Sequence, residues 1–118
     1  LKRRSDEWLH ENLNNPLRHW DGNEFISKSK YSKSLALWKE TRRRLLEAVA
    51  FSDAYIPSID RIVIDYVEGF NKLDSRSQFI ETEDREDIIN AFIQILDEAG
   101  ICKERNNIMQ LIDDNRNW

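Results

Sequence analysis

The segment PSIDRIVIDYVEGFNKL, residues 57–73, decides the fold because its apolar residues recur at the spacing of an α-helix. Pro57 suits the first turn of such a helix, which we expect to run to about Leu73. One face of this helix holds nearly all of its apolar residues, namely Ile59, Ile62, Val63, Tyr66, Val67, Phe70 and Leu73. The outer face is predicted to neutralise its own charge through i,i+4 ion pairs, namely Arg61 with Asp65 and Glu68 with Lys72.

Four further segments complete the expected set of helices. A helix is predicted from Tyr31 or Ser32 to Phe51, with an apolar stripe of Leu35, Trp38, Leu45, Leu46 and Val49. Another is predicted from an N-cap at Thr82 to a stop at Gly100, with a stripe of Ile88, Ile89, Phe92, Ile93, Leu96 and Ala99. Shorter helices are expected at 5–14, where Ser5 suits the N-cap, and at about 102–115.

The segment 15–30 is predicted to be a long connection that packs through its own side chains. It contains Pro16 and Gly22, yet its apolar residues Leu17, Trp20, Phe25 and Ile26 need a dry environment. With only 3 Gly and 2 Pro in 118 residues, turns are too few for a β-sandwich or barrel. We therefore predict a single all-α domain over residues 1–118, a compact bundle of four to five amphipathic helices.

Composition favours a globular protein of the cytoplasm. The chain is 40% hydrophobic and 34% charged, and it lacks the run of ~18 apolar residues that would span a bilayer. The basic start Leu1–Arg4 is followed by Ser5, Asp6 and Glu7 instead of an apolar core, so no signal peptide is expected. The lone Cys102 excludes an internal disulfide and fits a reducing compartment.

Catalytic and metal-binding motifs were sought and not found. The sequence has no glycine-rich phosphate loop, no G-x-S-x-G and no Cys/His cluster. His10-Glu11 begins like a zinc-protease motif, but Asn14 stands where the second histidine is needed one turn later. Cys102 has only Lys103 and Arg105 nearby to activate it, and packing at the core edge is the simpler expectation. We predict no enzyme activity, no metal and no cofactor.

One face of the helix at 82–99 is strongly acidic and carries no cation of its own. The acids on this face are Glu83, Glu86, Asp87, Asp97 and Glu98. The helix dipole explains the acids of the first turns, but Asp97 and Glu98 near the C-terminus oppose it by about 0.3 kcal/mol or more each. Two interpretations stay open: a docking face for a basic protein partner, or a solvated face that aids solubility.

Charge is also uneven along the chain, and Arg42 is its most unusual cation. Residues 1–44 carry a net charge of +5 and residues 45–118 a net charge of −9, within a total of −4. Arg42 projects into an apolar stripe, where we expect its stem to pack while its head reaches solvent or an acid. The predicted partner is an acid on the third or fourth helix, in a buried ion pair, and contact with an anionic ligand is the alternative.

These observations favour a non-catalytic protein-binding module, of the inhibitor or immunity type, that docks a basic partner through its acidic helix face. The alternative is a regulatory or adaptor domain that acts through homodimerisation or nucleic-acid binding. Arg42, Arg43, Arg44 and Lys39 would contact phosphates in that case. Nucleic acid is the less favoured partner, because the pI is about 5.2 and the three arginines point in different directions around the helix.

Overall fold

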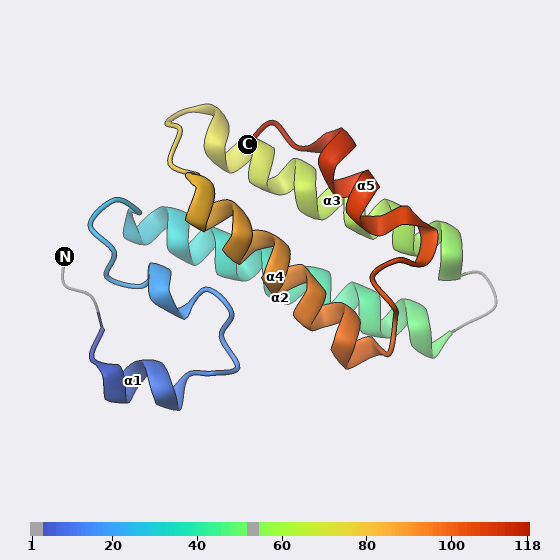
Figure 1. The fold of residues 1–118 in the computed structure, drawn as a ribbon, viewed down its shortest axis with the longest axis horizontal. Coiled ribbons are helices and arrows are strands. Elements are labelled where there is room, and N and C mark those ends of the chain that lie inside the picture. The colour runs from blue at the N-terminus through green and yellow to red at the C-terminus, as the bar shows by residue number, and fades with distance from the viewer. Residues whose placement is uncertain (1–3, 52–54) are drawn as a thin grey trace.

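The computed structural model describes residues 4–51 and 55–118, and within these ranges every regular element is a helix (Figure 1). The α-helices are α1 (Asp6–Glu11), α2 (Lys28–Ala50), α3 (Tyr55–Ser75), α4 (Thr82–Ala99) and α5 (Ile108–Asn115). Two short 3₁₀ turns, η1 (Arg18–Trp20) and η3 (Arg105–Asn107), lie between them. The predicted all-α bundle is confirmed. In the described ranges no helix is both long and apolar enough to cross a lipid bilayer.

The long helices α2, α3 and α4 run up and down beside one another, with α5 laid along α3 and α1 set apart at the edge (Figure 1). The apolar stripes predicted for these helices meet in one core, where Leu45, Val63, Phe70 and Phe92 are fully buried. Aromatic rings fill the space between α3 and α4, because the centroids of Tyr66 and Phe92 lie 5.0 Å apart.

Two buried polar contacts fix α4 on its neighbours. The indole N–H of Trp38 on α2 donates to the carbonyl of Ala91 at 2.8 Å. The hydroxyl of Tyr66 on α3 donates to the carbonyl of Ile88 at 2.7 Å, and burial raises the pKa of Tyr66 well above its usual value. Because buried polar groups are costly when unpaired, both bonds help to select one position of α4.

The helix ends differ from the predictions where local side chains offer better caps. Helix α2 begins at Lys28, several residues early, because Ser27 Oγ accepts the N–H of Lys30 at 3.1 Å. The N-cap of α4 is Glu81, so the prediction of Thr82 is wrong. There the backbone N–H of Glu81 donates to Asp84 Oδ2 at 3.0 Å. Gly100 ends α4 at φ 74°, as predicted.

The connection before α2 packs largely as predicted, with one exception. Leu17, Trp20 and Ile26 are buried in the common core, and Trp20 makes an edge contact with the ring of Phe79 at 5.9 Å. Phe25 was predicted to be buried, but its side chain is 80% exposed. Phe25 lies in a turn, in which its backbone N–H donates to Asn23 Oδ1 at 2.8 Å and the N–H of Ile26 donates to the carbonyl of Asn23 at 3.3 Å. In this turn Ile26 enters the core while Phe25 stays in solvent.

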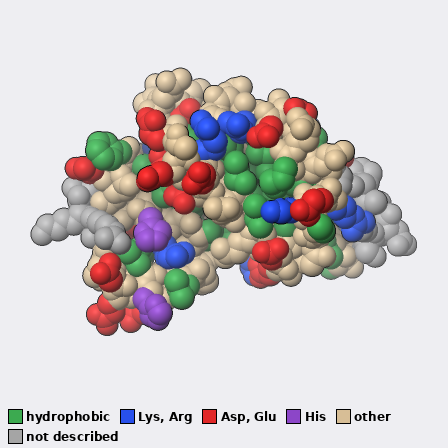
Figure 2. Space-filling view, viewed as in Figure 1, with side chains coloured by type: hydrophobic (Ala, Val, Ile, Leu, Met, Phe, Trp, Pro, Cys, Tyr) green, Lys and Arg blue, Asp and Glu red, His purple; other side chains and the backbone are tan. Residues whose placement is uncertain are grey.

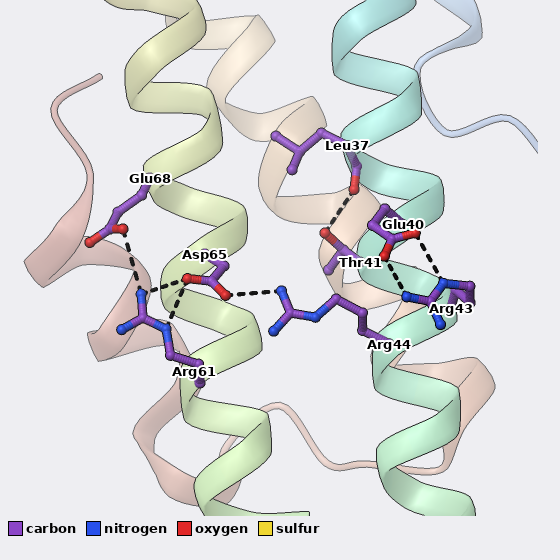
Figure 3. Close-up of polar contacts among 8 residues, drawn as sticks. All are labelled: Leu37, Glu40, Thr41, Arg43, Arg44, Arg61, Asp65 and Glu68. Carbon is purple, nitrogen blue, oxygen red and sulfur yellow. Dashed lines mark hydrogen bonds and ion pairs between the residues drawn. The ribbon is translucent and has the colours of Figure 1, made fainter.

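A line of ion pairs joins the outer surfaces of α2 and α3 (Figure 3). Asp65 accepts hydrogen bonds from Arg61, as predicted, and from Arg44 on α2 at 2.9 Å. Glu68 lies 3.5 Å from Arg61, so the predicted pair with Lys72 is wrong. This surface therefore balances its charge across two helices as well as along one.

Candidate functional site

Three of the five acids predicted to form a docking face are exposed carboxylates without a cationic partner among the described residues. Glu83 and Glu86 lie in the first turns of α4 and Asp97 in its last turn. Among the described residues, none of these three carboxylates has a lysine, arginine or histidine nitrogen within 4 Å. Their charges are therefore exposed to solvent and available to a binding partner at this face.

The fourth acid, Asp87, has a structural contact. Its Oδ2 accepts a 3.0 Å hydrogen bond from the indole N–H of Trp20, whose side chain is only 1% exposed. Asp87 is itself half-buried. This carboxylate anchors the connection between α1 and α2, and it is a poor candidate for contact with a partner.

The fifth acid, Glu98, is neutralised by Arg42, so the expectation of an acidic face without a cation is wrong at this position. Arg42 Nε donates to Glu98 Oε2 at 2.7 Å, and a second guanidinium nitrogen donates to Oε1. These hydrogen bonds lower the pKa of Glu98 below its usual value. Arg42 has the predicted acid partner on the fourth helix, but both side chains are 41% exposed, so the ion pair is at the surface and not buried.

Negative charge is concentrated where α4 begins. Figure 2 shows acidic side chains gathered there, with apolar and basic side chains between them and the acids farther along. Partial burial raises the pKa of Asp84, and the negative charges of Asp87, Glu81 and Glu83 raise it further. Burial is the larger cause of this rise, and the neighbouring acids add to it because several carboxylates gather in the first turns of α4.

An exposed aromatic ring lies beside these acids, although its exposure was not predicted from the sequence. Phe25 and Glu83 both line a hollow of about 320 Å³ at the start of α4. The remaining residues of the hollow are Asn23, Ile26, Glu81, Thr82 and Asp84. The available signal was the turn-favouring pair Gly22-Asn23 just before Phe25, because residues of a surface turn are commonly exposed.

The arginine run of α2 is engaged by carboxylates. Arg43 donates to Glu47 at 2.8 Å. Figure 3 shows that Arg43 also donates to Glu40 and that Arg44 donates to Asp65, the latter at 2.9 Å. With Arg42 held by Glu98, each of the three arginines has an acid partner. This arrangement offers little unpaired positive charge for a nucleic-acid backbone.

The candidate metal and thiol residues of the sequence lie apart from one another in the described parts of the chain. Within 4–51 and 55–118, no three His, Cys, Asp or Glu side chains gather in a way that could hold a metal ion. Cys102 is exposed and not at the core edge, and its thiol donates to Glu104 Oε2 at 2.7 Å.

Compared with models of known families, with curated proteins and with solved structures, the chain matches none. The fold defines an all-α helical bundle whose most distinctive surface is the start of α4. Any account of its function therefore rests on the residues of this chain.

Proposed function

We propose that the protein is a non-catalytic binding module that docks a basic protein partner through the start of α4. The docking surface consists of the exposed acids Glu83 and Glu86 together with Phe25. The observation that supports this proposal is the 80% exposed ring of Phe25, which shares a hollow with Glu83 where unpaired negative charge is concentrated. Asp97 adds charge at the far end of the same helix.

Charge and aromatic surface have separate roles in such a contact. Exposed carboxylates attract a basic partner from a distance and mainly raise the association rate. A large aromatic side chain that becomes buried in the contact supplies much of the binding energy, as interface hot spots commonly do. Asp87 and Glu98 contribute less, because each already has a partner within the fold.

Within this class, we favour an inhibitor or immunity-type protein, because an acidic surface can imitate phosphates and occupy a cationic active site. The lone thiol of Cys102 is compatible with a reducing compartment such as the cytoplasm. The alternative of a nucleic-acid adaptor has less support, since Arg42, Arg43 and Arg44 all carry carboxylate partners.

The experiment compares capture of partners at low salt by three forms of the protein. The first is the wild type and the second carries Glu83→Gln, Glu86→Gln and Asp97→Asn. The third removes the same number of exposed acids elsewhere, through Glu7→Gln, Glu11→Gln and Asp114→Asn.

We expect one basic protein to be captured by the wild type and the matched control and lost by the α4 variant. Equal capture by all three forms, or equal loss in both variants, would overturn the proposal, because total charge and not the docking surface would then govern binding.

A further inference from the structure

A second hollow, at the opposite end of α4 from the docking surface, is large enough for a small molecule. It is a groove of about 770 Å³ between the segment that contains Trp8 and Asn14 and the neighbouring helices α2 and α4. Volumes of about 300–1,000 Å³ are typical of small-molecule sites. Its walls combine aromatic rings, carboxamides and cations, so it is not a purely apolar gap.

The carboxamides of the groove fall into two groups. Asn12 and Asn15 are used by the fold. Asn12 Nδ2 donates to the carbonyl of Trp8 at 2.8 Å, while Asn15 Nδ2 donates to the Tyr31 hydroxyl at 2.8 Å and its Oδ1 accepts the N–H of Leu17 at 3.0 Å. Asn14 and Gln94 are exposed, and neither side chain has a hydrogen-bond partner in the part of the chain that the structure describes. These two groups therefore offer donors and acceptors to a ligand.

The charge of the groove is positive. Arg42 and Glu98 both line it and neutralise each other, which leaves Lys39 as the remaining charged wall residue. Among the described residues, no carboxylate lies within 4 Å of the Lys39 ammonium. Lys39 and Arg42 lie three residues apart on α2, so both cations occupy the same side of the helix.

Aromatic surface completes the groove. Trp8 and Tyr31 line it and are half-buried, while Trp38 is only 5% exposed and its N–H is already used. The guanidinium of Arg4, which is paired with Asp21, lies 4.8 Å from the centroid of the Trp8 ring and covers part of one face of it. Half-buried rings of this kind are surfaces on which a flat heterocycle stacks.

We propose that this groove binds a nucleoside monophosphate, a function separate from the docking surface. A purine or pyrimidine ring would stack on Trp8 or Tyr31, and the carboxamides of Asn14 and Gln94 would bond its polar edge. The phosphate would lie against Lys39 and the free side of Arg42. A neutral sugar would use the rings and carboxamides but would leave the unpaired lysine without a role.

A single nucleotide fits better than a nucleic-acid chain. Farther along α2, Arg43 and Arg44 are held by carboxylates and so provide no track for successive phosphates. The volume of the groove, about 770 Å³, is that of a small-molecule site.

The test is isothermal titration calorimetry at low salt with adenosine 5′-monophosphate, and with adenosine, inorganic phosphate and maltose as comparison probes. The variants are Lys39→Ala, Gln94→Ala and Glu98→Gln. Lys33→Ala is the matched control, because Lys33 is an exposed lysine of the same helix that does not line the groove. Circular dichroism verifies that each variant is folded.

We expect saturable 1:1 binding of the monophosphate, tighter than that of adenosine or phosphate alone. Lys39→Ala should weaken it about tenfold, as the loss of a charge-assisted hydrogen bond predicts. Glu98→Gln should strengthen it, because it removes a negative charge and frees Arg42, and Lys33→Ala should leave it unchanged. Absence of saturable binding, preference for maltose, or equal effects of Lys39→Ala and Lys33→Ala would overturn the proposal.

Discussion

Trp20 and Asp87, 67 residues apart in sequence, are joined by a 3.0 Å hydrogen bond from the indole N–H to the carboxylate. This contact ties the connection between α1 and α2 to the N-terminal part of α4. It also divides the acidic residues of α4 by role, since Asp87 holds the fold together while Glu83 and Glu86 remain free. The acids of one helix face are therefore not equivalent.

Loss of this hydrogen bond should cost stability. Asp87→Ala leaves a buried indole N–H unpaired, and we expect the free energy of unfolding to fall by about 1–3 kcal/mol. Glu86→Ala is the control, because Glu86 is exposed on the adjacent position, and it should change stability by less than about 0.5 kcal/mol. Urea unfolding of both variants measures the difference, and equal stabilities would contradict the structural role of Asp87.

Gly69 on α3 packs closely against Leu37 on α2, so substitutions at these two positions should have strongly non-additive effects on stability. A Cβ atom at Gly69 would lie 2.6 Å from Leu37 Cδ2, closer than atoms pack without movement. In a Leu37→Ala background, Gly69→Ala should stabilise the protein by up to about 1 kcal/mol through helix propensity. In the wild-type background that gain should vanish or reverse. A double-mutant cycle by chemical unfolding checks this, and additive effects would show that the helices do not approach closely here.

The ionisation of Asp65 should make the stability of the protein depend on pH in the acidic range. Partial burial acts to raise the pKa of Asp65, but the hydrogen bonds from Arg61 and Arg44 outweigh it, so this pKa lies below its usual value. The resulting stability is present above about pH 3.9, the pKa of an unperturbed aspartate, and is lost as the pH falls through the lower folded value.

The variant Asp65→Asn tests this dependence. At pH 7 it should lower the free energy of unfolding by no more than about 1 kcal/mol, because the side chain is 36% exposed and solvent screens the pairs. The difference from wild type should shrink as the pH falls below 4. A difference that stays constant between pH 7 and pH 3 would contradict the ionic contribution.

The ion pair of Arg42 with Glu98 should contribute little to stability despite its two hydrogen bonds. Both side chains are 41% exposed, and exposed pairs typically contribute about 0.2–1 kcal/mol. We expect a coupling energy in that range from a cycle of Arg42→Ala and Glu98→Ala, measured by thermal unfolding. It should decrease when salt is raised from 0.05 to about 1 M, because salt screens exposed charges. A coupling energy above this range that does not change with salt concentration would mean that the pair is effectively buried.

The helices were predictable because their signals are local. The apolar spacing of residues 57–73 predicts that Ile59, Val63 and Phe70 lie in the core, as they do. Gly100 ends α4 because glycine readily adopts the left-handed backbone conformation of a helix C-cap. The N-cap of α4 was missed because Thr82 fits the usual preference, whereas the observed cap depends on a bond between Glu81 and Asp84. A propensity describes one residue at a time, and this cap needs two.

The candidate site was only partly predictable because its contacts join distant segments. Sequence spacing grouped the five acids on one face of α4 but could not assign Glu98 to Arg42, 56 residues earlier. Nor could it assign Asp87 to Trp20. The exposure of Phe25 depends on which of two adjacent apolar residues enters the core, a choice that tertiary packing makes.

The most direct test of the proposed docking surface is the association rate constant of the captured basic partner, measured as ionic strength is raised. For the wild type, we expect a rate constant that falls steeply as salt is raised. For the variant with Glu83→Gln, Glu86→Gln and Asp97→Asn, we expect a slower rate that depends little on salt. Identical salt dependence in both forms would contradict the claim that the acids of α4 guide the partner to this surface.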